Sequence, residues 1–160
     1  MTPEEVEELI KPVSIEEIKS TMFAIKEDKA PGPDGFSSHF FKAAWRIIGE
    51  DVVAAVRHFF SSSFILPCFN ATVVALIPKN QSPRSIKEYR PISCCSVIYK
   101  CITKIMANRI KQFMPTLVGN NQCAFIPGCS ISDNILMAQE LVRDYNRSSL
   151  SSRCAIKVDL

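Results

Sequence analysis

The stretch SVIYKCITKIMANRIKQF, residues 96–113, has the pattern of an amphipathic helix. Its apolar side chains recur every three or four residues, which is the periodicity of a helix with one face in a core. The inward residues are Ile98, Ile102, Ile105, Met106 and Phe113, and the opposite face carries Lys100, Lys104, Asn108 and Lys111. Arg109 falls on the apolar side. We expect it to have a buried partner or to lie at a helix end, because an unpaired buried charge is costly.

A second helix is expected on the amino-terminal side. Ser14 and Glu17 have the spacing of a capping box, so this helix should begin at Ile15. Its apolar stripe consists of Ile15, Ile18, Met22 and Ile25. The segment PGPDG at 31–35 should end it, because proline disfavours a helical residue before it.

Further elements are expected downstream. From Ser37 two helices should follow each other, separated by Gly49, with the second running to about residue 60. Residues 71–77 are short, β-branched and apolar, which predicts a strand, and a strongly basic loop should occupy 78–91. Asp133 can begin another helix that ends near residue 146, and residues 155–160 have the pattern of a strand. We therefore expect a helix-rich α/β (α+β) chain.

Composition excludes several classes of protein. The chain has 47% apolar and 22% charged residues, as ordinary folded domains do. Its longest apolar run, 52–56, is too short to cross a membrane. The acidic residues 1–13 lack the features of a secretory signal, so we expect an intracellular location, in nucleus or cytoplasm. The seven cysteines include no C-x-x-C pair, which favours reduced thiols over a zinc site.

Charge is distributed unevenly along the chain. Residues 1–28 carry eight acids and three bases, whereas residues 29–160 carry eight acids and sixteen bases, a net charge of +8. A basic body fits a partner that bears phosphates, since lysine and arginine contacts release counterions from such a partner. A surface that is merely soluble would have the same charge, so both interpretations stay open.

Six segments stand in a characteristic order. They are PGPDG at 31–35, ALIPK at 75–79, YRPIS at 89–93, NQCAFIPG at 121–128, SDNI at 132–135 and KVDL at 157–160. Together, over about residues 12–160, they resemble the amino-terminal half of the reverse transcriptase domain of plant-type non-LTR (LINE-type) retrotransposons. The resemblance implies a right-hand polymerase, incomplete here. Residues 1–13 would be an acidic leader, 14–153 the fingers-like part and 154–160 a truncated first palm strand.

The resemblance also implies site residues. Lys79 and Arg90 match fingers positions that bind the triphosphate of the incoming nucleotide, although by charge alone they could be two surface cations. Asp159 matches the first catalytic aspartate of the palm, a ligand of Mg²⁺, and a carboxylate at the end of an apolar strand suits that role. The implied partners are an RNA template, a DNA primer and deoxynucleotide triphosphates, with no membrane.

Other residues match the segment that lies near the template in this family. They are Gln122, Phe125, Gly128, Asp133 and Asn134. Cys129 departs from the pattern, because relatives usually carry a basic residue there, and a phosphate contact would be lost. Lys100, Lys104 and Lys111 could add a stripe that follows a nucleic-acid backbone, but a solvated helix face is an equal alternative.

The 160 residues hold no aromatic residue followed by two aspartates, which is the family's second palm motif. Since one carboxylate cannot hold two close cations, we expect no measurable polymerase activity from this piece alone. We also expect exposed apolar surface and a poorly cooperative fold. Two alternatives stay open: a non-catalytic module that binds nucleic acid, and, less favoured, a helical protein-interaction domain.

Overall fold

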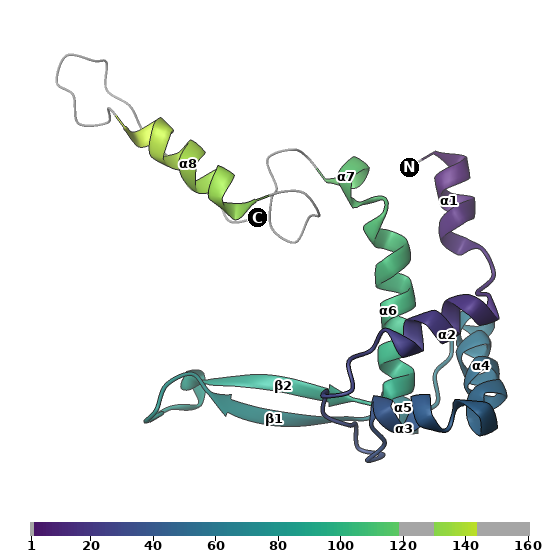
Figure 1. Ribbon diagram of the computed structural model, residues 1–160. Coiled ribbons are helices and arrows are strands. Elements are labelled where there is room, and N and C mark those ends of the chain that lie inside the picture. The colour runs from purple at the N-terminus through teal and green to yellow at the C-terminus, as the bar shows by residue number, and fades with distance from the viewer. Residues whose placement is uncertain (1, 119–129, 144–160) are drawn as a thin grey trace. The chain divides into compact units, whose positions relative to one another are not determined.

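The computed structural model describes residues 2–118 and 130–143 (Figure 1). It is a helix-rich mixed α/β structure with one two-stranded sheet, and it divides into a unit of residues 2–112 and a second unit that begins at Phe113. The first unit contains α1 (Pro3–Ile10), α2 (Ile15–Phe23), α3 (Ser38–Ala43), α4 (Trp45–Ser62), α5 (Pro67–Asn70), β1 (Thr72–Pro78), the 3₁₀ turn η1 (Ile86–Glu88), β2 (Tyr89–Cys95) and α6 (Val97–Lys111). The second contains α7 (Met114–Leu117) and α8 (Ile131–Val142). In the described ranges no helix is long and apolar enough to span a bilayer.

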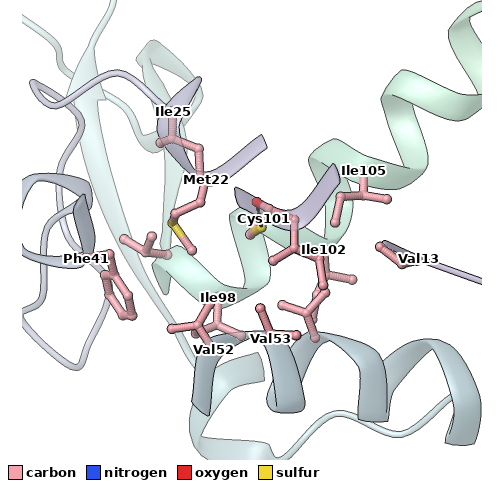
Figure 2. Packing of buried hydrophobic residues seen from close by; sticks show 13 residues of the cluster. Val13, Met22, Ile25, Phe41, Val52, Val53, Ile98, Cys101, Ile102 and Ile105 are labelled. Atoms are coloured by element: carbon pink, nitrogen blue, oxygen red, sulfur yellow. Dashed lines mark hydrogen bonds between the residues drawn. The ribbon is translucent and has the colours of Figure 1, made fainter. Parts of the chain in front are cut away.

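The core of the first unit lies where α2, α4 and α6 pack on one another. Figure 2 shows Ile98 and Ile102 of α6 pointing toward Val52 and Val53 of α4, with Met22 of α2 beside them. The helix predicted for 96–113 is confirmed, and its apolar face is the one that is buried. Each large apolar side chain removed from water contributes roughly 1.5–3 kcal/mol, so this contact dominates the stability of the unit.

Helix α2 begins as predicted and ends earlier than predicted. The Ser14 hydroxyl accepts a hydrogen bond from the backbone N–H of Glu17 at 3.0 Å, which caps the first turn. The helix ends at Phe23, well before PGPDG, so the prediction that this segment ends the helix is wrong. Ile25 lies beyond the helix end and is nevertheless buried in the core.

Gly49 does not separate two helices. The break lies at Ala44, and α4 runs through Gly49 without interruption, so this prediction is wrong. A Cβ at position 49 would lie 3.0 Å from Cε2 of Trp45, the first residue of the same helix. The missing side chain therefore leaves room for the indole ring, and that packing offsets the low helix propensity of glycine.

The two strands form an antiparallel hairpin. Strand β1 confirms the prediction for 71–77, but β2 lies in and beyond the segment that we expected to be loop. Cα partners run from Thr72 with Cys95 to Pro78 with Tyr89. In Figure 1 the hairpin extends away from the helices of its unit. Most of its residues are exposed on both faces, including Val73, Val74, Leu76, Ile77 and Ile92.

PGPDG packs against the base of the hairpin. A Cβ on Gly32 would lie 2.5 Å from the backbone N of Ser96 and 2.7 Å from the carbonyl carbon of Cys95. Only glycine fits this close approach of two backbones. Ser96 caps α6 by accepting from the N–H of Tyr99, and its hydroxyl donates to the carbonyl of Phe69 at 2.8 Å. The junction between β2 and α6 thus contacts Gly32 on one side and the carbonyl of Phe69 on the other.

Arg109 has a partner, which is half-buried, and it also lies in the last turn of α6, so both alternatives expected for it are present. Its side chain is 7% exposed and forms two hydrogen bonds with the carboxylate of Glu17, at 2.9 and 2.7 Å. The same guanidinium donates to the carbonyls of Leu9 and Lys11, so it also holds the end of α1. Helix α1, which we did not predict, has its own capping box between Thr2 and Glu5. The domain limits expected at 13/14 and 153/154 stay predictions.

Candidate functional site

The hairpin brings Lys79 and Arg90 together. Arg90 is the Cα partner of Ile77, and Lys79 lies two residues beyond Ile77 on the same chain. Because side chains alternate along a strand, Lys79 and Arg90 lie on the same face of the ribbon. The backbone N–H of Lys79 donates to the carbonyl of Glu88 at 2.7 Å, so the pairing continues past the end of β1. Diagonal neighbours of this kind have Cα atoms about 7–8 Å apart.

The loop between the strands is closed by hydrogen bonds to its own residues. The ammonium group of Lys79 donates to the carbonyl of Lys87 at 2.7 Å. The carboxylate of Glu88 accepts from the backbone N–H of Arg84 at 2.7 Å and from the side-chain amide of Asn80 at 3.4 Å. Ser85 caps η1 by accepting from the N–H of Lys87. The two cations therefore stand on an ordered loop.

The charge of this loop suits an anionic ligand. Residues 79–90 carry four cations, Lys79, Arg84, Lys87 and Arg90, and a single acid, Glu88. All four cationic residues are exposed, and Glu88 is half-buried. Lysine supplies a compact charge with three N–H donors, while arginine supplies a planar fork, and phosphate oxygens accept from both. The arrangement therefore offers positive charge and N–H donors to a phosphate chain.

Two of the three candidate lysines on α6 have partners within the fold. Lys100 donates to the carbonyl of Ala30 at 2.7 Å, and Lys104 donates to the carbonyl of Ala24 at 3.3 Å. Both side chains are half-buried, whereas Lys111 is exposed. Lys100 and Lys104 thus hold the segment between α2 and PGPDG. A nucleic-acid contact of this face stays a prediction.

The candidates near the carboxyl terminus mostly lie outside the described residues. These are Gln122, Phe125, Gly128, Cys129 and Asp159. Asn134 is exposed on α8, which begins at Ile131 with Ser130 as its cap, two residues before the expected start at Asp133. Among residues 2–118 and 130–143 no cluster of three or more His, Cys, Asp or Glu side chains could hold a metal ion. The magnesium site expected at Asp159 stays a prediction.

Sequence reasoning missed the hairpin that pairs the two cations, and with it the hydrogen bonds of Glu88 to Arg84 and Asn80. Alternation from Tyr89 to Cys95 is weak, and Pro91 argued against a strand. Pro91 is tolerated because a two-stranded sheet consists of edge strands alone. The useful signal was the turn-rich stretch NQSPRS, residues 80–85, directly after a confident strand.

Comparison with known proteins identifies relatives over nearly the whole chain. Residues 77–160, more than half of the chain, match the family described as Reverse transcriptase (RNA-dependent DNA polymerase). The chain is 28% identical over 145 residues to the uncharacterized 149 kDa protein of transposon TX1 from Xenopus laevis, a match covering 91% of this chain and 11% of that protein. It is 27% identical over 140 residues to the retrovirus-related Pol polyprotein of the type-1 retrotransposable element R2 from Nasonia vitripennis, covering 88% of this chain and 13% of that protein. The chain thus spans about an eighth or less of these relatives.

Proposed function

The chain belongs to the reverse transcriptase (RNA-dependent DNA polymerase) family, and we propose that its hairpin binds the triphosphate of the incoming deoxynucleotide during RNA-templated DNA synthesis. The observation that carries this proposal is the register of β1 and β2, which brings Lys79 and Arg90 to one face of an exposed ribbon. The relatives found are proteins of non-LTR retrotransposons, and the chain is a part of a reverse transcriptase of that kind. A plant-type origin remains our hypothesis.

The chemistry follows from what two cations can do beside a triphosphate. As the bond to pyrophosphate breaks, negative charge grows on the leaving phosphates. The ammonium group of Lys79 has three N–H donors, of which one donates to the carbonyl of Lys87 and two are left for phosphate oxygens. Arg90 offers a planar pair of donors. Fixed donors that already point at the developing charge stabilise it without reorganisation. In this proposal Lys79 and Arg90 bind and orient the triphosphate and neutralise its charge.

The proposal of a magnesium ion rests on the family alone. Reverse transcriptases use Mg²⁺ to stabilise the attacking and leaving oxygens. The described residues contain no cluster that fits this ion. We propose Asp159 as one of its ligands, on the match of KVDL to the first palm strand, and derive no step from it.

The remaining expectations are proposals as well. An RNA template and a DNA primer are the partners that the family implies. Gln122, Phe125, Gly128 and Asn134 are proposed to lie near the template, and an intracellular location, in nucleus or cytoplasm, is proposed with them. No observation on the described residues favours a separate, non-catalytic nucleic-acid-binding module.

Binding of a deoxynucleotide triphosphate to the 160-residue chain tests the proposal. Lys79→Ala and Arg90→Ala should each weaken binding about tenfold or more, because each removes a hydrogen bond to a charged group. Isothermal titration calorimetry of dATP at low salt measures the affinity. Lys19→Ala, which removes an exposed lysine on α2, is the matched control and should change it little. Equal affinities for all three variants would contradict the proposal.

A further inference from the structure

Glu88 is the one acid in the cationic loop 79–90, and it lies beside both proposed phosphate ligands. The N–H of Lys79 donates a hydrogen bond to the carbonyl of Glu88, which is the last residue of η1, two positions before Arg90. A negative charge at this place weakens the attraction of the loop for phosphate. On charge alone, the loop would bind phosphate more tightly without Glu88.

The contacts of Glu88 show what this residue contributes instead. Its carboxylate oxygen Oε2 accepts from the N–H of Arg84 and from the amide of Asn80, while its own N–H donates to the carbonyl of Ser85. Asn80 follows Lys79 on the opposite arm of the loop, and Arg84 lies four residues before Glu88, so the carboxylate joins these two parts of the loop. The side chain is half-buried, and its two hydrogen bonds are exposed.

The ammonium group of Lys79 depends on the same closure. It donates to the carbonyl of Lys87, the residue directly before Glu88. If the loop opened, this carbonyl would no longer hold Lys79 on the face that Arg90 shares. The closure therefore determines whether the two cations meet one phosphate chain or point independently into solvent.

Resting on the proposed function, we propose that Glu88 is a positioning residue for the phosphate-binding pair Lys79 and Arg90. Its carboxylate contributes two opposing effects: its hydrogen bonds hold the loop closed, and its charge lowers the affinity of that loop for phosphate. The first effect needs an acceptor oxygen, and the second needs the negative charge. Glutamine keeps the oxygen without the charge, and alanine removes both.

This separation gives a test with two variants of the same net charge. Glu88→Gln should bind inorganic tripolyphosphate and dATP about threefold more tightly than the unchanged chain, as expected for removing one charge about 7 Å away in water. Glu88→Ala should bind about fivefold more weakly, because loss of the closing hydrogen bonds outweighs the same gain in charge. Glu16→Gln and Glu16→Ala, at an exposed acid on α2, are the matched controls and should stay close to the unchanged chain.

Amide hydrogen exchange supplies a second, independent measurement. The N–H of Arg84 should be protected in the unchanged chain and in Glu88→Gln, and should lose protection in Glu88→Ala, while amides of α6 stay protected in all three. Loss of protection throughout α6 would mean that Glu88 supports the fold in general, which would overturn the inference.

The outcomes separate this inference from the proposed function. If Lys79→Ala and Arg90→Ala weaken binding but Glu88→Ala binds as tightly as Glu88→Gln, Glu88 acts through its charge alone and only the inference fails. If the chain does not bind either phosphate compound, or binds it independently of Lys79 and Arg90, the proposed function fails and the inference with it.

Discussion

Arg109 joins three segments of the chain through one buried guanidinium. It contacts Glu17 at the start of α2 and the carbonyls of Leu9 and Lys11 at the end of α1, and its charge lies 5.8 Å from the ring centre of Phe60. Replacing it by methionine, of similar length, leaves Glu17 and both carbonyls without this donor. We predict that Arg109→Met lowers the free energy of unfolding by about 2–3 kcal/mol, measured by urea denaturation.

The control for this substitution is Arg143→Met. Arg143 pairs with Glu140 on α8, but both side chains are more than two thirds exposed. An exposed pair of this kind contributes roughly 0–1 kcal/mol, so the loss should be small. Equal losses in the two variants would show that burial of Arg109 has no energetic importance.

The same pair makes stability depend on pH. The hydrogen bonds from Arg109 hold the pKa of Glu17 below its ordinary value of 4.5. A carboxyl group whose folded pKa is depressed stabilises the fold above its unfolded pKa, and the contribution is lost as pH falls through the folded value. Urea midpoints should therefore decrease below about pH 4.5, and Arg109→Met should reduce this decrease. If the urea midpoint of Arg109→Met depended on pH as that of the unchanged chain does, the assignment of this dependence to Glu17 and Arg109 would be wrong.

Cys101 should resist alkylation in the folded chain. It is fully buried, and burial raises the pKa of its thiol to about 12. Since the thiolate is the reactive form, almost none is present near neutral pH. Peptide mass spectrometry after iodoacetamide treatment should find Cys68, which is exposed, modified before Cys101. Both should react at the same rate in 6 M guanidinium chloride. Early modification of Cys101 without denaturant would contradict this prediction.

At the scale of elements, the loop that carries PGPDG and the base of the hairpin are fitted to each other. Gly32→Ala places a Cβ against the backbone of Ser96, which cannot rotate away as a side chain could. We predict a loss of about 1–3 kcal/mol in unfolding free energy, typical of overpacking.

At Gly35 the backbone conformation, and not a lack of space, favours glycine. Its φ of 75° favours glycine, but a Cβ there would meet nothing within 4 Å. Asparagine tolerates this backbone conformation better than other residues do, so Gly35→Asn should cost less than Gly35→Ala. At position 32 asparagine should be no better than alanine. The melting temperatures of Gly32→Ala, Gly32→Asn, Gly35→Ala and Gly35→Asn test this prediction. A higher melting temperature for Gly32→Asn than for Gly32→Ala would exclude the steric explanation.

Elements defined by local signals could be predicted from the sequence. Ser14 and Ser96 mark helix starts by capping, and the periodicity of α6 also placed Arg109 in the core. Elements that depend on distant contacts could not. Strand β2 exists because β1 lies beside it, and Gly49 continues a helix because Trp45 covers it. Helix α1 was missed although Thr2 and Glu5 have capping-box spacing, because its acidic residues suggested a leader.

For the candidate site, the identity of Lys79 and Arg90 came from the resemblance, and their proximity came from the structure. No local pattern relates residues eleven positions apart across a proline-containing loop. The hydrogen bonds of Lys100 and Lys104 were equally hidden, because their acceptors are backbone carbonyls about 70 to 80 residues away. A helical pattern shows which way a lysine points, but it does not show which segment lies there.

Across the first unit as a whole, the hairpin exposes large apolar side chains on both of its faces. Val74 and Leu76 lie on one face and Val73 and Ile77 on the other, and each is about half exposed. An isolated two-stranded ribbon is only marginally stable, and exposed apolar strands favour association. We predict that the chain self-associates with rising concentration, measured by sedimentation velocity.

Threonine substitutions identify the surface responsible for such association. Threonine keeps the β-branched shape of Val74, introduces it at Leu76, and reduces apolar area at both positions. The double variant Val74→Thr, Leu76→Thr should sediment closer to a monomer. Ile47→Thr, at an isolated exposed position on α4, is the control and should not change the association. A concentration-independent monomer for the unchanged chain would contradict the prediction.

The contacts of Arg109 also constrain the order of events during synthesis. The carbonyl of Leu9 and the carboxylate of Glu17 meet a residue 100 and 92 positions later in the chain. The segment of α1 and α2 therefore cannot reach its final contacts until α6 has emerged from the exit tunnel. At about 5–20 residues per second, α1 and the start of α2 wait several seconds or longer for α6. During that time Ile18 and Met22 lack the isoleucines of α6, and a chaperone that shields apolar segments would meet the nascent chain in this interval.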